Sequence, residues 1–224
     1  MIHYTANSLN QYESRTVPSY AAVRGVSDFE TLVTVNDLPA AQVPPFFHGG
    51  VEVDNTASPV QQPITVTASY PVPDGSSEPD LFTTETGSLF IPQDPELFTY
   101  DPDGNLLTDG RFSYSWDAEN RLIQVESLPS TTLTNYPIRV DYTYDHRYRR
   151  TVKRVYTLDD QSHAWLPSET RHFLYDDWNL VKETTIALVA PSGSGGVHTT
   201  NTTHYTWGLD LSGSLRGLGS LILS

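Results

Sequence analysis

The chain has 224 residues, a formal net charge of −14, and a hydrophobic fraction of 38%. This length suffices for one large or two small domains, and this apolar content is that of a folded chain rather than a disordered one. The excess of carboxylates argues against nucleic acid and anionic membranes as partners, because an acidic surface repels phosphate backbones and anionic lipid headgroups.

The charge is uneven, with a balance of −10 over residues 1–98 and −4 over residues 99–224. The absence of cysteine excludes disulfides and thiol catalysis. The opening residues "MIHYTANSLNQY" have neither the basic nor the apolar region of a signal peptide. Because no stretch approaches the roughly 20 apolar residues of a spanning helix, we expect no membrane insertion.

Many Thr, Val and Tyr residues, with turn residues about every ten positions, predict an all-β fold. Residues 25–95 contain short alternating runs, "TLVTVN" (31–36), "VEVD" (51–54), "ITVTASY" (64–70) and "SLFIP" (88–92), separated by Pro- and Asn-rich breakers. This pattern predicts a small antiparallel β-sandwich that resembles an immunoglobulin-like domain.

From residue 96 a self-similar unit replaces this pattern. It is a strand with aromatics two residues apart, ending in aromatic–Asp, and its copies are "LFTYD" (97–101), "FSYSWD" (112–117), "VDYTYD" (140–145), "HFLYD" (172–176) and "HYTWG" (204–208). The spacing of two places the aromatics on one strand face. A turn and a second strand follow most copies, so each predicts an irregular β-hairpin repeat.

Two sets of residues define the repeat. The expected strand-face anchors are Tyr100, Trp116, Tyr144, Tyr175 and Trp207. The expected turn residues are Asp101, Gly104, Asn105, Asp117, Asn120, Arg121, Asp145, Asp176, Trp178, Asn179 and Gly208. We expect the aspartates to cap the turns by accepting backbone N–H bonds, with Gly104 or Asn105 at positive φ.

The segments "YDPDGNLLTDGRFSYSWDAENRLIQV" (100–125), "YTYDHRYRRTVKRVY" (142–156), "RHFLYDDWNLVKE" (171–183) and "HYTWGLDLSGSLRGLG" (204–219) closely resemble the RHS/YD-repeat family. The resemblance covers residues 96–219, and "YTANSLNQYESRTVP" (4–18) resembles a further, degenerate copy. The implied organisation is a degenerate repeat over 1–24, the sandwich over 25–95, and repeats over 96–224 that end at a truncated core boundary.

The resemblance implies a large secreted or cell-surface protein whose hairpins wind into a spiral sheet and close as a hollow shell. In bacterial members, which are polymorphic toxins, the shell encloses a C-terminal toxin released by an aspartyl self-cleavage site. Asp94-Pro95 and Asp101-Pro102 lack the sequence context of that site. We therefore expect a partial β-shell, part of a longer protein, whose partners are the rest of the shell or a C-terminal cargo domain.

Three specific functional sites are alternatives, and each fits the residues less well than a structural role. "DPDGNLLTDGRF" (101–112) begins like a calcium loop, but Leu106 and Phe112 occupy the positions that need Gly and Glu. The repeated aspartates could be a catalytic pair, but repetition favours a common structural role. The basic run "RYRRTVKR" (147–154) could bind nucleic acid, although pairing with acidic neighbours fits the overall charge better.

The sequence therefore predicts a non-catalytic structural segment with no catalytic, cofactor or metal residues. The alternative is an extracellular carbohydrate- or adhesion-type binding module, because Tyr and Trp on an exposed β face can stack sugars.

Overall fold

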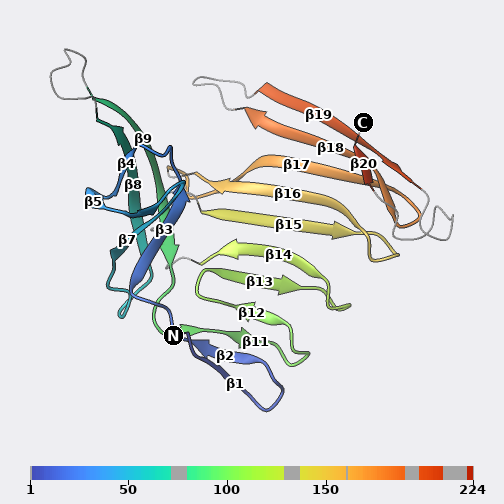
Figure 1. The fold of residues 1–224 in the computed structure, drawn as a ribbon. Coiled ribbons are helices and arrows are strands. Elements are labelled where there is room, and N and C mark those ends of the chain that lie inside the picture. Colours follow the sequence, from blue (N-terminus) through green and yellow to red (C-terminus); the bar gives the residue numbers. More distant parts are fainter. Residues whose placement is uncertain are drawn as a thin grey trace. The chain divides into compact units, whose positions relative to one another are not determined.

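The computed structural model describes residues 2–71, 80–128, 137–159, 161–189, 197–208 and 221–223. All of the regular secondary structure in these ranges is β-strand (Figure 1). Within these ranges the strands form antiparallel sheets. The predicted all-β fold is confirmed.

The first unit comprises residues 1–99 and 108–111, and it contains three small sheets. One sheet has the order β1-β2-β10, with β1 (Tyr4–Ala6), β2 (Tyr12–Arg15) and β10 (Glu96–Leu97). A second has the order β3-β7-β6, with β3 (Tyr20–Val26), β7 (Phe46–Glu52) and β6 (Ala41–Val43). A third has the order β5-β4-β8-β9, with β5 (Leu38–Pro39), β4 (Leu32–Val35), β8 (Val60–Tyr70) and β9 (Leu81–Ile91).

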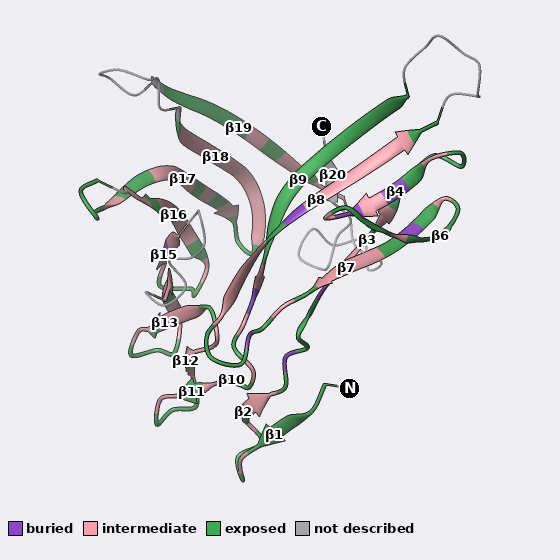
Figure 2. Cartoon of the chain, turned by 90° about the vertical axis from the view of Figure 1, so that its left-hand side faces the viewer, coloured by how far each residue is buried: buried purple, intermediate pink, exposed green. Residues whose placement is uncertain are grey.

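The second and third of these sheets share one hydrophobic core and so form a sandwich. Val33 and Val35 of β4 are 2% and 1% exposed, and they lie in one cluster with Phe47 of β7 and Ile64 of β8. These residues alternate with exposed or half-buried neighbours along their strands, so each sheet turns one apolar face inward (Figure 2).

Most of the ten-stranded sheet belongs to the second unit, residues 100–107 and 112–224. Its strands follow one another in chain order, which makes a meander of hairpins. They are β11 (Thr99–Tyr100), β12 (Leu106–Thr108), β13 (Phe112–Trp116), β14 (Leu122–Ser127), β15 (Ile138–Tyr144), β16 (Arg150–Leu158), β17 (Trp165–Asp176), β18 (Asn179–Val189), β19 (Val197–Trp207) and β20 (Leu221–Leu223).

Strand pairing separates the two faces of this sheet. Tyr114 pairs with Val125, Val125 with Val140, and Val140 with Val155, so all four lie on one face. Neighbouring residues such as Gln124 and Asp141 lie on the other face. The aromatic anchors lie at or near the ends of β13, β15, β17 and β19, and the strand register shifts next to Trp116, Tyr144 and Tyr175.

Some strands are longer than the sequence patterns indicated. β9 starts at Leu81, although only residues 88–92 show a strand-like pattern. Residues 81–89 of β9 are all exposed, so burial imposes no apolar alternation on them. β17 likewise begins seven residues before His172, at Trp165.

Candidate functional site

The turn that follows Tyr144 closes through one carboxylate. The backbone N–H of Asp145 donates to the carbonyl of Arg149 at 3.0 Å, and the N–H of Tyr148 donates to the carbonyl of Asp145 at 3.1 Å. The Asp145 Oδ1 atom accepts the N–H groups of Arg147 and Arg149 at 2.8 and 3.1 Å. The side chain therefore satisfies donors that the short loop leaves without a strand partner.

The turns at Asp101 and Asp117 have the same backbone bonds, N–H to the carbonyl of the residue four positions on. In each of the three turns the fourth residue has positive φ: Gly104 at 90°, Asn120 at 58° and Tyr148 at 63°. Gly and Asn tolerate positive φ better than other residues, which explains why Gly104 and Asn120 occupy this position in two of the three turns.

The fifth residue of each turn donates from its side chain back to the aspartate. Arg121 Nε lies 2.7 Å from Asp117 Oδ2, and Arg149 Nε lies 2.8 Å from Asp145 Oδ2. Asn105 Nδ2 takes the same place at 3.0 Å from Asp101 Oδ2. One carboxylate oxygen thus binds the loop backbone and the other binds the side chain of the fifth residue.

These bonds favour the ionised carboxylates. Burial alone would raise the pKa of Asp145, but bonds from the Arg149 side chain and from backbone N–H groups outweigh it and lower the pKa to about 2. For Asp117, burial also acts to raise the pKa, and the backbone and side-chain bonds from Arg121 lower it below the usual value. The side chain of Asn105 is the main cause of the lowered pKa of Asp101.

A fourth turn of this type lies at Asn7, within the segment 4–18 that resembles a degenerate copy of the repeat, although Asn7 was not among the expected turn residues. Asn7 Oδ1 accepts the N–H groups of Leu9 and Gln11 at 2.9 and 3.0 Å, and Asn10 has a φ of 62°. Asn7 Nδ2 donates to Gln11 Oε1 at 2.8 Å. The signal for this turn was an Asn in place of Asp, with an amide four residues later.

Contacts also run from each turn to the next one in the sheet. Asn105 Nδ2 donates to Asn120 Oδ1 at 2.7 Å, and Arg121 Nη1 donates to the carbonyl of Asp145 at 3.4 Å. Arg149 Nη1 donates to the carbonyl of Asp177. We name this series of contacts, from Asn105 to Asp177, the turn ladder.

The aromatic anchors link the same hairpins through their polar atoms. Four of the five donate to the carbonyl of a residue just after the preceding turn. The pairs are Trp116 Nε1 to Leu106 at 2.8 Å, Tyr144 OH to Leu122 at 2.8 Å, Tyr175 OH to Arg150 at 3.2 Å, and Trp207 Nε1 to Leu180 at 2.7 Å. These contacts explain why the anchors are Tyr or Trp, since Phe has no donor.

The arginines of the ladder stack on the anchor rings of the next hairpin. The guanidinium carbon of Arg121 lies 5.4 Å from the ring centre of Tyr144, and that of Arg149 lies 5.3 Å from the ring centre of Tyr175. Each arginine therefore binds its own aspartate, the next turn's carbonyl and the next anchor's ring.

The turn after Tyr175 differs from the other three. Asp176 is the last residue of β17 and pairs directly with Asn179, which leaves a two-residue turn of Asp177 and Trp178. Asp177 has a φ of 51°, and Trp178 is 65% exposed. Asp177 forms an ion pair with Arg147 at 2.8 Å, and its carbonyl accepts a bond from Arg149.

The remaining predicted residues lie at strand ends. Tyr100 is half-buried in β11, and Gly208 follows Trp207 at the end of β19. Across the described ranges, no three His, Asp or Glu side chains gather as a metal site. The turn carboxylates are instead bonded to their own loops, so what this arrangement can do is hold neighbouring hairpins in register.

No protein-family model matches the chain, and no curated protein shows significant similarity to it.

We predict that Tyr144→Phe lowers the free energy of unfolding by about 1 kcal/mol, because it removes the bond to the Leu122 carbonyl and keeps the ring under Arg121. Urea unfolding measures this change. Tyr148→Phe is the matched control, since Tyr148 is 59% exposed. Equal effects of the two substitutions on the free energy of unfolding would contradict a stabilising role for the bond from Tyr144 to Leu122.

We predict that Asp145→Asn removes an acid-sensitive part of the stability. The folded pKa of Asp145, about 2, lies below the unfolded value of about 3.9. Its contribution is therefore present above about pH 4 and is lost as the pH falls toward 2. The stability difference between wild type and Asp145→Asn should shrink over that range in urea titrations.

Asp103→Asn is the control for this titration, because it removes an exposed carboxylate from the turn at Asp101. A difference between wild type and Asp145→Asn that stays constant from pH 7 to pH 2 would show that the carboxylate bonds contribute nothing.

Proposed function

We propose that the chain is a non-catalytic structural segment of an RHS/YD-repeat protein. In this role it contributes to a β-shell that encapsulates or presents a C-terminal, toxin-like domain. The observation that supports the proposal is the repeated anchor bond, in which four successive Tyr or Trp side chains donate to the hairpin before them.

The β-shell of such a protein is built from repeats. Each repeat must therefore contact its neighbours in a way that recurs along the sheet. The anchors and the turn ladder have this property. Arg121 contacts the hairpin of Tyr144, and Arg149 contacts the hairpin of Tyr175. The carboxylates of Asp117 and Asp145 are bonded to the arginines of their own turns.

The proposal places the parent protein at the cell surface or outside the cell, with the rest of the shell and the C-terminal domain as partners. The described part of the chain contains no helix that could span a membrane.

The test uses the chain together with its natural flanking sequence and follows proteolysis of the domain after the repeats. We expect this domain to resist protease in the wild type. It should be digested faster when Arg121 and Arg149 are both replaced by Ala, because both ladder contacts are lost.

The matched control is Arg154→Ala, an exposed arginine on a strand of the same sheet. Equal digestion in the wild type and in the double variant would contradict the encapsulating role.

One observation favours the alternative, an extracellular carbohydrate-binding or adhesion module. Of the four tryptophans, Trp178 is the exposed one, at 65%, and it lies at the tip of the β17–β18 hairpin. Exposed indole rings stack on sugar faces.

The two functions predict different results on a glycan array. The structural role predicts no binding, so the wild type and Trp178→Ala should both give background signal. Wild-type binding that Trp178→Ala abolishes, and that Trp165→Ala leaves intact, would replace the structural proposal with the binding module.

A further inference from the structure

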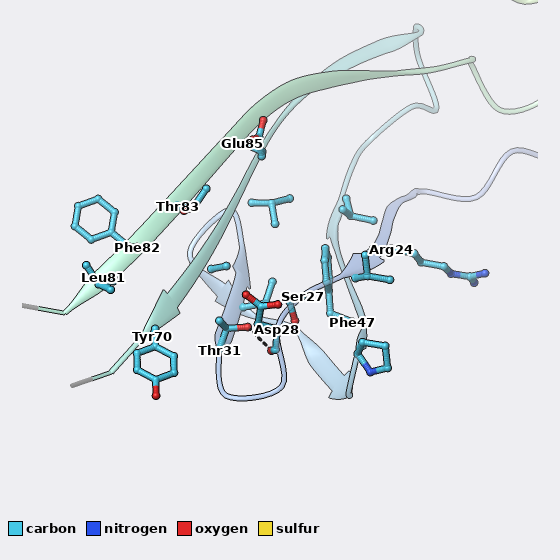
Figure 3. A pocket seen from close by; sticks show the side chains of 17 residues that line it. Arg24, Ser27, Asp28, Thr31, Phe47, Tyr70, Leu81, Phe82, Thr83 and Glu85 are labelled. Atoms are coloured by element: carbon cyan, nitrogen blue, oxygen red, sulfur yellow. Dashed lines mark hydrogen bonds between the residues drawn. The ribbon is translucent and has the colours of Figure 1, made fainter. Parts of the chain in front are cut away.

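In the described part of the first unit, the two sheets of the sandwich differ by one strand. Its β3-β7-β6 sheet has three strands, and the sheet opposite has four. β3 and β9 are the edge strands next to an open groove, which is lined by residues of both and by the core between them (Figure 3). All of these residues lie in the first unit.

The inward side of β9 lies uncovered along this groove. Ile64 of β8 is buried in the core and pairs with Gly87, so Gly87, Glu85 and Thr83 all lie on the inward row of β9. All three are exposed, and a Cβ added to Gly87 would meet no atom within 4 Å. Figure 2 shows the same strand as exposed along most of its length.

A strand added beside β3 would cover this row. β3 is seven residues long, and its inward residues Ala21, Val23 and Gly25 alternate with the exposed residues of the strand. An edge strand presents unpaired N–H and C=O groups along its open side, which is the template for strand addition. The floor beside it is apolar, with Val33 and Phe47 among its residues.

The size and charge of the groove indicate the occupant. Its volume, about 1310 Å³, exceeds the roughly 300–1,000 Å³ of typical small-molecule pockets. Its lining includes the carboxylates of Glu85 and Asp28. The one cation of the lining, Arg24, belongs to the outward row of β3, and its side chain extends away from Phe47 (Figure 3). Among the described residues that line the groove, none brings a positive charge inward opposite Glu85.

We propose that the groove binds an extended peptide segment of a partner protein, added as a strand to the free edge of β3. Alternate apolar side chains of the peptide fill the groove, and a lysine or arginine of the peptide pairs with Glu85. This peptide site does not depend on the proposed structural role in a β-shell, because none of the residues that line the groove belongs to the turn ladder.

The test measures fluorescence anisotropy with labelled nine-residue peptides of alternating valine and threonine, one valine being replaced by lysine at each position in turn. We expect at least one peptide to bind the full chain. Thr83→Trp, which fills the groove, should weaken binding by about tenfold or more. Thr84→Trp, on the outward row of the same strand, should leave it unchanged.

A charge exchange checks the pairing without relying on a bulky substitution. Glu85→Lys should weaken the lysine peptide and strengthen its glutamate counterpart, whereas Glu52→Lys, an exposed carboxylate on β7, should do neither.

Four outcomes would overturn the proposal. The first three are binding by none of the peptides, equal effects of Thr83→Trp and Thr84→Trp, and full binding both by peptides with proline at the odd positions and by peptides with proline at the even positions, since one of these two sets lacks the N–H groups that face β3. A dimer in sedimentation velocity that Thr83→Trp dissociates would also overturn it, since the occupant would then be a second copy of this chain.

Discussion

One interaction recurs in three successive turns of the repeat sheet, the bond between a turn aspartate and the side chain of the residue four positions after it. In the turns at Asp117 and Asp145 that residue is an arginine, and the same guanidinium then contacts the next turn and the next aromatic ring. Removing the carboxylate therefore does more than open one loop, because it releases the group that joins two hairpins. The low pKa of Asp145 reflects how strongly these donors favour its charged form.

The two units of the chain are stabilised in different ways. Among the described residues, seven of the eight buried hydrophobic side chains lie in the first unit, and Val140 is the one in the second. The sandwich thus has the shared apolar core usual for packed sheets. The repeat sheet instead relies on half-buried aromatics, the bonds that they donate to neighbouring hairpins, and the turn ladder.

Much of this arrangement could be predicted from the sequence. The period-two aromatics predicted the strands, and the recurring aromatic–Asp pairs predicted the hairpins and their turns. The partners of the anchor bonds could not be predicted from the sequence. The carbonyls that accept bonds from Tyr144 and Trp207 belong to residues 22 and 27 positions earlier in the chain. The turn at Asn7 was hidden by an Asn in place of Asp. Asp176 matched the repeat pattern, yet the loop after it is too short for its side chain to cap. The open groove was hidden because the exposed β9 has no apolar alternation.

Hydrogen exchange of Arg149→Ala, with Arg154→Ala as control, tests most directly whether the turns couple neighbouring hairpins. The account predicts that Arg149→Ala lowers amide protection in both the β15–β16 and β17–β18 hairpins, because Arg149 contacts Asp145 in one and Asp177 and Tyr175 in the other. Arg154→Ala should leave both protected. Loss of protection confined to the turn at residues 145–149 would contradict the claim that the ladder holds the hairpins together.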